Sequence, residues 1–307
     1  MTERQNDPAT IVLDGVTIRY GRTVAADSVT IGVNKGTVHA LLGRNGAGKT
    51  SLIRCLLGER KPQRGSISLL GEDPWRKRAK LMARTGVVPE DPDAPPGMTA
   101  KQLEAFCSKL YDSWDARSFR ERLTRFAVPY DLPFGRLSKG QKRQLMLALA
   151  LGPMPEVLVL DDPTLGLDPV ARRSFFEELV GELADRSTTV FLTSHDLAGV
   201  EGIADHVGVM REGRLLLDEP MDSLKGRFRL LTFGRNRAAQ DSDSALQAMR
   251  PLRVSQRPWG MEAVVQDFND EAFAAFAATP GVTDLDASPM TLEDIFVALD
   301  AEEGGRP

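Results

Sequence analysis

Short apolar runs separated by glycine and polar turns dominate the first part of the chain. From residue 9 to about residue 68 these runs have the pattern of strands, most clearly at residues 11–13, 16–20 and 29–33. A further apolar run at residues 38–42 reads as a buried strand. The apolar residues that follow this strand are spaced as on one face of a helix, and the predicted helix ends at Gly58. The pattern predicts that the chain begins with several strands that belong to an α/β core.

The middle of the chain changes to helical spacing and then returns to strands. Between about residues 91 and 152, apolar residues such as Leu103 and Phe106 recur at steps of three and four, which predicts a helical insert. Buried strand runs return at residues 157–160, 190–193 and 207–210, each after a helical stretch. This alternation is typical of parallel crossover units, so we expect an α/β core with its ligand site at the carboxyl ends of the strands.

The composition changes again after about residue 223. We expect a first domain at residues 9–222 and a small α+β C-terminal domain at residues 223–307, with an exposed polar loop at residues 234–243 and a turn at Trp259 and Gly260. The expected elements of the second domain are strands near residues 230–232, 252–255 and 263–265, and helices near residues 271–278 and 292–299.

Composition and charge narrow the classes of function. The chain has 307 residues, a net charge of −4 and no long basic run, so no nucleic acid is expected as a partner. The polar first eight residues lack the order of a secretion signal, and the longest apolar run, residues 145–151, is far shorter than the roughly 20 residues that span a bilayer. Cys55 and Cys107 have no metal-ligand spacing and are expected to be reduced core residues of a cytoplasmic protein.

A glycine-rich loop between the strand at residues 38–42 and the following helix carries the most distinctive chemistry. Glycines at this spacing let backbone N–H groups turn toward a β-phosphate, Lys49 adds positive charge and Thr50 offers a hydroxyl ligand to Mg²⁺. An ordinary turn does not need this spacing, so the loop predicts binding of a nucleoside triphosphate. Its residues are Gly43, Arg44, Asn45, Gly46, Ala47, Gly48, Lys49 and Thr50, followed by Ser51.

Four further segments occur in a fixed order after this loop. Residues 137–141, Leu-Ser-Lys-Gly-Gln, resemble the Leu-Ser-Gly-Gly-Gln signature of ATP-binding-cassette (ABC) ATPases. Residues 157–164 resemble the Walker B strand, residues 165–169 the D-loop and residues 193–196 the switch-histidine segment. The resemblance covers roughly residues 10–220. It implies an ABC ATPase core, that is, a P-loop NTPase fold with a mixed sheet and a helical subdomain at about 91–152, which binds ATP and Mg²⁺.

The signature residues have two interpretations that hold together. Ser138 and Gln141 form a capping box that starts the following helix. The resemblance implies that Ser138 and the Gly140 amide also meet the γ-phosphate of ATP bound to a second molecule, with Gln141 and Asp168 in the same nucleotide-binding set. Lys139 replaces a signature glycine and either adds charge near the triphosphate or points to solvent.

Two aspartates end the Walker B strand. An unpaired buried carboxylate at Asp161 is costly, but Mg²⁺ held by Thr50 would neutralise it; the alternative is a helix N-cap. Asp162 lies where the family usually carries the glutamate that polarises the attacking water. Because its side chain is one methylene shorter, we predict slow hydrolysis. The resemblance makes His195 the switch histidine, although a lone histidine after such a strand equally fits a core residue.

The resemblance to the family also marks Tyr20 and Glu90 as candidate nucleotide- and metal-binding residues. Tyr20 lies where an aromatic residue of the family stacks on adenine, although an aromatic packed in a strand has the same pattern. Glu90 replaces the usual Q-loop glutamine, and a carboxylate is a harder Mg²⁺ ligand than an amide. Glu90 is therefore predicted to hold the metal together with Thr50 and Asp161, and to act in catalysis. His39 and His206 lack such context and are expected to be structural.

The resemblance implies a dimer in which two ATPase units close around ATP. This chain supplies one unit, so the expected partners are a second ATPase subunit, in a homodimer or a heterodimer, and a separately encoded integral-membrane permease docked near residues 90–114. The signature variant, Pro89-Glu90 and residues 110–115 and 290–296 are similar to export-type subunits for drugs, antibiotics or stress response. The expected location is the inner face of the cell membrane, as a peripheral protein.

Two alternatives remain from other classes. A soluble ABC ATPase without transport would resemble translation factors, which usually carry two cassettes, or repair ATPases, which have a long coiled coil; neither feature occurs in this sequence. A regulatory nucleotide-binding module gains some support from Asp162. Measuring ATPase activity with and without membranes that contain a co-expressed permease separates the three.

Overall fold

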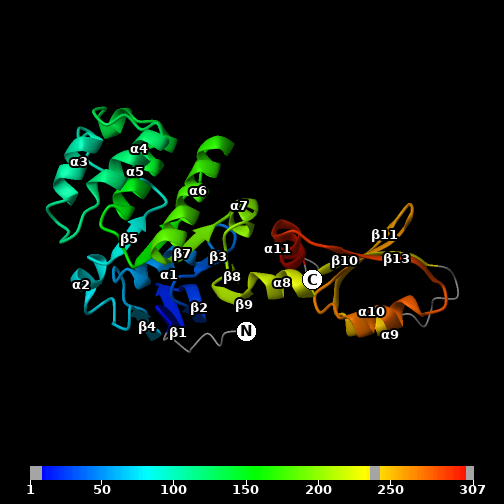
Figure 1. Cartoon of the computed structure of the whole chain (residues 1–307). Helices are drawn as coiled ribbons and strands as arrows, with labels where there is room; N and C mark the ends of the chain where they lie inside the picture. The colour runs from blue at the N-terminus through cyan, green and yellow to red at the C-terminus, as the bar shows by residue number, and fades with distance from the viewer. Residues whose placement is uncertain (1–8, 236–242, 302–307) are drawn as a thin grey trace. The chain divides into compact units, whose positions relative to one another are not determined.

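The computed structural model describes residues 9–235 and 243–301, which fall into two compact units, Met1–Asp218 and Glu219–Pro307 (Figure 1). The polar start of the chain and residues 236–242 of the predicted loop lie outside the described residues. The predicted domain boundary at residue 222 stays a prediction.

Two sheets form the framework of the first unit. A six-stranded sheet has the order β5-β6-β7-β3-β8-β9, and the pairs from β5 to β8 are parallel, as the alternation of strands and helices predicted. A three-stranded antiparallel sheet has the order β2-β1-β4. The strands are β1 Ile11–Tyr20, β2 Thr23–Val33, β3 Val38–Leu42, β4 Arg64–Leu69, β5 Thr85–Val88, β6 Val157–Asp161, β7 Thr189–Ser194, β8 His206–Arg211 and β9 Arg214–Pro220.

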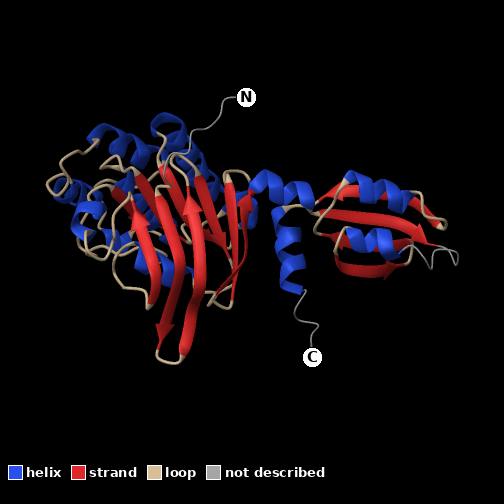
Figure 2. Ribbon diagram, turned by 90° about the horizontal axis from the view of Figure 1, so that it is seen from below, coloured by secondary structure: helices blue, strands red, loops and turns tan. Residues whose placement is uncertain are grey.

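Helices complete the first unit. Figure 2 shows its strands lying together with helices gathered on one side. The helices are α1 Lys49–Leu56, α2 Arg78–Met82, α3 Ala100–Cys107, α4 Ala116–Arg125, a 3₁₀ turn Phe134–Arg136, α5 Lys139–Leu151, α6 Pro169–Arg186 and α7 Leu197–Glu201. The predicted helical insert is therefore α3, α4 and α5, which lie at one end of the unit (Figure 1).

The core of the first unit lies between the sheets and α1. Every residue of β3 and of β6 is buried, as expected for parallel strands covered on both faces. The core joins Leu13 and Ile31 of the antiparallel sheet to Leu52 of α1 and Phe191 of β7. Both cysteines are free; Cys55 is buried as predicted, whereas Cys107 is only partly buried and is not a core residue.

The second unit is a four-stranded antiparallel sheet with helices. Its order is β11-β12-β10-β13, and α9 and α10 lie side by side on one face (Figures 1 and 2). Leu231, Ala263 and Val265 of the sheet pack there against Met249 and Phe276. The elements are α8 Met221–Arg227, β10 Arg229–Arg235, α9 Asp243–Ala248, β11 Pro251–Arg257, β12 Gly260–Val265, α10 Asp270–Ala277, β13 Val282–Pro289 and α11 Leu292–Ala301.

The sequence predicted three of these four strands and the helices at α10 and α11. It missed α8, α9 and β13. The predicted loop is also shorter than expected, because Gly234 and Arg235 belong to β10 and Asp243 begins α9. Among the residues that the structure describes, no helix combines the length and the apolar composition needed to cross a membrane.

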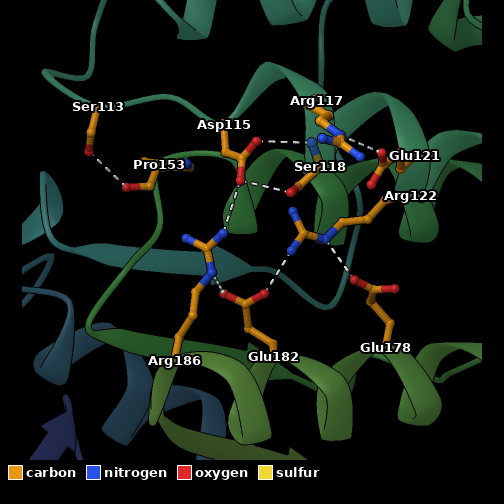
Figure 3. A network of polar contacts seen from close by, with 10 residues as sticks. All are labelled: Ser113, Asp115, Arg117, Ser118, Glu121, Arg122, Pro153, Glu178, Glu182 and Arg186. Atoms are coloured by element: carbon orange, nitrogen blue, oxygen red, sulfur yellow. Dashed lines mark hydrogen bonds and ion pairs between the residues drawn. The ribbon is translucent and has the colours of Figure 1, made fainter.

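A network of ion pairs joins the helical insert to α6 (Figure 3). Arg122 of α4 donates from Nε to Glu178 and from Nη2 to Glu182, both at 2.7 Å. Arg186 pairs with Glu182 at 3.3 Å and with Asp115, the N-cap of α4, at 2.9 Å. Arg122 and the two glutamates are at least nine-tenths buried, so this contact includes ion pairs that are shielded from water.

Candidate nucleotide-binding site

The glycine-rich loop connects β3 to α1, as the sequence predicted. Gly46 and Gly48 have φ angles of 84° and 108°, in the region that favours glycine. A Cβ on Gly48 would lie 1.9 Å from the Ala25 carbonyl oxygen, so no other residue fits there without moving the backbone. The loop therefore brings its N–H groups to the N-terminus of α1, where the helix dipole favours an anion.

Lys49 lies in the floor of this loop. Its side chain is buried, and its ammonium donates to the carbonyl oxygen of Gly43 at 2.6 Å. Loss of water lowers the pKa of Lys49, while the carboxylates of Asp162, Asp161 and Glu90 act in the opposite direction. Three carboxylates thus act on Lys49, and a polyphosphate bound here would add further negative charge, which a divalent cation beside Lys49 would offset.

Oxygen ligands suited to Mg²⁺ lie next to that ammonium. The hydroxyls of Thr193 and Thr50 donate to Asp161 Oδ1 at 2.7 and 3.3 Å, and the carboxylate is buried at the end of β6. A hydroxyl beside a buried carboxylate is the hard oxygen set that Mg²⁺ prefers. The residues present therefore fit this ion, which Thr50 and Asp161 would hold.

Asp162 and His195 are in direct contact. His195 Nδ1 lies 2.6 Å from Asp162 Oδ1, and the His195 backbone N–H donates to the same oxygen at 3.1 Å. Asp162 has a φ of 46°, a left-handed conformation that aspartate tolerates better than most residues. Its backbone is fixed by Thr193, which accepts from its N–H, and by Arg143, which donates to its carbonyl at 3.1 Å.

A pocket of about 420 Å³ brings most of these groups together. This volume lies in the range of small-molecule sites. It is lined by Tyr20, Thr23, Val24, Ala25, Asn45, Gly46, Ala47, Gly48, Lys49, Thr50, Ser51, Glu90 and Asp162. A neighbouring pocket shares Thr50 and Glu90 and adds Asp161, and the predicted role of Glu90 as a metal ligand stays a prediction.

Sequence reasoning missed several residues around this pocket. Thr23, Val24 and Ala25 of β2 form a wall that no motif marked. Thr193 belongs to the switch-histidine segment, but its hydroxyl bond to Asp161 could not be inferred from spacing. Arg143 lies within the polar first half of α5, residues 139–144, so no pattern distinguished this buried residue from its neighbours.

Tyr20 lies at the rim of the pocket and is 39% exposed. The guanidinium of Arg60 lies 4.0 Å from the centre of its ring and also donates to the Arg19 carbonyl. A planar cation over an aromatic ring is a favourable contact that fixes the ring. Tyr20 is therefore an oriented surface residue rather than part of the packed interior.

The signature residues and Asp168 lie at helix starts outside this pocket. Ser138 caps α5 in a capping box, accepting from the Gln141 N–H at 3.1 Å and donating from its own N–H to the Gln141 side chain at 3.0 Å. Asp168 caps α6 by accepting from the N–H groups of Val170 and Ala171. The predicted capping box of Ser138 and Gln141 is confirmed, and the contact of the signature residues and Asp168 with phosphate stays a prediction.

The fold and this site define a P-loop nucleoside-triphosphate-binding protein. The family profile described as ABC transporter matches residues 26–165. The chain is 36% identical over 217 residues to the bacitracin transport ATP-binding protein BcrA of Bacillus licheniformis, covering 70% of this chain and 71% of that protein. This chain belongs to the family of ABC transporter ATP-binding subunits. ABC ATPases bind and hydrolyse ATP.

Two further relatives extend the comparison. The Nod factor export ATP-binding protein I of Burkholderia orbicola is 38% identical over 205 residues, covering 65% of this chain and 67% of that protein. The solved structure of cbiO1 from Clostridium perfringens, part of the ABC transporter complex cbiONQ, aligns with a TM-score of 0.61 at 27% identity. That alignment covers 70% of this chain and 90% of the other. The predicted fold class and family are confirmed.

Proposed function

We propose that this chain is the ATP-binding and hydrolysing subunit of an exporter whose permease is a separate polypeptide. The observation that carries the proposal is the convergence of the phosphate loop, Tyr20, Glu90 and Asp162 on one pocket. Similarity to proteins named for bacitracin transport and Nod factor export supports export as the direction.

The residues around the phosphate loop bind and neutralise the triphosphate. The loop amides and Lys49 hold the phosphates, while Thr50, Asp161 and Glu90 supply oxygen ligands for Mg²⁺. When bound, Mg²⁺ neutralises phosphate charge and orients the phosphate oxygens. Tyr20 stacks on adenine, with its ring held by Arg60.

Asp162 orients the attacking water and accepts its proton, and His195 holds the Asp162 carboxylate in place. The 2.6 Å contact between them supports this division of roles. General bases of this kind contribute about 10² to 10⁴ in rate, but only within hydrogen-bonding reach of the water. Because the aspartate side chain is one methylene shorter than that of glutamate, its carboxylate lies farther from the water, and slow turnover is expected.

Two copies of this chain form the working ATPase. Ser138, Gly140, Gln141 and Asp168 are not among the described residues that line the pocket, so a site that includes them needs another chain. Because each chain carries both a phosphate loop and a signature, two copies in a two-fold arrangement complete two sites. ABC ATPases act as dimers with membrane permease components, which agrees with this arrangement.

The permease docks on the helical insert from the cytoplasmic side of the membrane. On and just after α3, Phe106 and Leu110 are 56% and 63% exposed, which is typical of a surface covered by a partner. Both lie within the predicted docking region of residues 90–114. The chain is thus a peripheral protein of the inner membrane face.

An ATPase assay with membranes tests the proposed function. Membranes containing a co-expressed polytopic protein from a neighbouring reading frame are expected to bind the chain and stimulate its ATP hydrolysis. Membranes without that protein serve as the control. Equal activity with both membranes, and no retention of the chain on either, would contradict a transport role and favour the non-transport or regulatory alternatives.

Replacement of Tyr20 tests the adenine contact. Tyr20→Ala is expected to weaken ATP binding about 5- to 150-fold, because base stacking on an aromatic side chain contributes about 1–3 kcal/mol. Tyr20→Phe keeps the ring and is the matched control, with near-normal affinity. The measurement is a titration with a fluorescent ATP analogue modified on the ribose. An unchanged affinity in Tyr20→Ala would remove Tyr20 from the site.

Replacement of Glu90 tests its role as a metal ligand. Glu90→Gln removes one negative charge beside Thr50, and the Mg²⁺ concentration that half-saturates ATPase activity is expected to rise about tenfold, or 1.4 kcal/mol. Glu59→Gln neutralises another carboxylate of the neighbouring pocket and is the control, with no expected change. If both variants require the same Mg²⁺ concentration as the unmodified chain, Glu90 does not hold the ion.

A further inference from the structure

A second group of ligand-type side chains lies in the first unit, outside the residues that line the nucleotide pocket. His39 of β3, His206 of β8 and Asp218 of β9 come from three neighbouring strands. One donor atom from each lies within 4.8 Å of the others. His39 Nε2 is 2.7 Å from Asp218 Oδ1, and His206 Nε2 is 3.7 Å from the same oxygen.

Ring stacking holds the two imidazoles in place. His39 lies between Phe191 on β7, with ring centres 5.6 Å apart, and His206 on β8, with ring centres 5.2 Å apart. The rings are nearly parallel, with interplanar angles of 21° and 18°. The sheet therefore presents two oriented nitrogens to one carboxylate, which reduces the rearrangement that a bound cation would require.

Burial and the surroundings of the group fit a bound cation. His39 is fully buried and turns its Nε2 toward Asp218, while its Nδ1 has no hydrogen-bond partner among the described residues. Gly208 brings no side chain to the group, and a Cβ there would lie 3.2 Å from Asp218 Oδ1 and 3.5 Å from His39 Cε1. The Nε2 side of the imidazole is therefore the side that an ion would occupy.

We propose that His39, His206 and Asp218 bind a divalent transition-metal ion, with Zn²⁺ as the best match. Two imidazole nitrogens and one carboxylate oxygen are ligands that Zn²⁺ takes at about 2.0–2.2 Å, with water in the fourth position. Nitrogen ligands disfavour Mg²⁺, so this site differs in kind from the oxygen ligands at Thr50 and Asp161.

The exposure of the three side chains fits such a site. The His39 side chain is 1% exposed and fixed, whereas His206 and Asp218 are 30% and 19% exposed. The two partly exposed side chains give the ion access from solvent and supply the small movement that brings all three donors into bonding distance. The bound ion ties β9, the last strand of the first unit, to β3 and β8.

Titration of the full chain with Zn²⁺ tests this site. The chain is first freed of metal and then studied by calorimetry without nucleotide, with excess Mg²⁺ present to occupy oxygen sites. One Zn²⁺ per chain is expected, and His206→Ala and Asp218→Asn should each weaken it at least about tenfold. Co²⁺ bound in place of Zn²⁺ should give the visible absorption of a tetrahedral ion with nitrogen ligands. Circular dichroism checks that each variant is folded, and His206→Ala, which replaces a partly exposed residue, is decisive if Asp218→Asn does not fold.

His195→Ala is the matched control, because His195 is the only other histidine of the chain and lies beside Asp162. Its Zn²⁺ affinity is expected to equal that of the unmodified chain. The proposal is overturned if the unmodified chain binds no Zn²⁺, if folded His206→Ala binds it with unchanged affinity, or if His195→Ala abolishes binding and so moves the ion to the nucleotide site.

Discussion

Asp162→Asn is expected to lower ATP turnover about 100-fold or more while leaving ATP affinity near normal, because the amide cannot accept the proton of the attacking water. In the proposed site the phosphates are held by the loop and Lys49, which this substitution leaves unchanged. The measurements are phosphate release at saturating ATP and titration with a fluorescent ATP analogue. The two readouts separate a loss of chemistry from a loss of binding.

Asp162→Glu is the complementary variant. It restores the longer carboxylate that the family usually carries at this position, and the turnover is expected to rise above that of the unmodified chain. Unchanged turnover in Asp162→Asn would show that Asp162 does not orient the water. A fall in turnover with Asp162→Glu would show instead that the contact with His195 at 2.6 Å requires the shorter side chain.

Arg122→Met is expected to destabilise the first unit by about 3 kcal/mol, because it removes a cation that two buried carboxylates share. Glu178 and Glu182 are 9% and 3% exposed, and in the variant they keep their ion pairs with Arg125 and Arg186 but lose the buried guanidinium between them. Methionine has a similar length and no charge, so the loss is chiefly electrostatic. The measurement is urea-induced unfolding followed by tryptophan fluorescence, since Trp114 lies against Phe119 of α4.

Arg117→Met is the matched control on the same helix. Arg117 pairs with Glu121 four residues along and is 88% exposed, so its loss is expected to change stability by less than about 0.5 kcal/mol. If Arg122→Met and Arg117→Met cost the same, the network of Figure 3 contributes no more than an ordinary surface ion pair. A loss confined to Arg122→Met would show that this buried pair helps hold the helical insert on α6.

The parts of the fold that could be predicted from the sequence are those in which a single element carries a distinctive glycine or apolar pattern. The phosphate loop and β3, β6 and α1 carry dense glycine or apolar patterns, because parallel strands buried on both faces tolerate few polar residues. β13 was missed because it reads Val-Thr-Asp-Leu-Asp-Ala-Ser-Pro, and its residues are mostly exposed or half-buried. Such a strand is recognised by its pairing with β10 rather than by its own composition.

In the site, too, residues within a local motif could be predicted from the sequence, whereas contacts between segments far apart in the sequence could not. Motifs predicted Lys49, Asp161 and Asp162 because their chemistry follows from position in a strand–loop–helix unit. The wall formed by β2 and the stacking of Arg60 on Tyr20 depend on residues brought together from separate strands and loops. The grouping of His39 with its neighbours on β8 and β9 is of the same kind, and sequence spacing alone gave it a structural role.

In the proposed dimer, each ATP is held between the phosphate loop of one chain and the signature of the other. Mixing two inactive variants tests it directly: Lys49→Ala removes the phosphate cation, and Ser138→Asp keeps a residue able to cap α5 but repels the triphosphate. In a mixed dimer one site combines the intact loop of one chain with the intact signature of the other. The mixture is expected to recover on the order of a quarter of normal ATPase activity, since about half the dimers are mixed and each holds one intact site. A mixture as inactive as either variant alone would contradict the shared site.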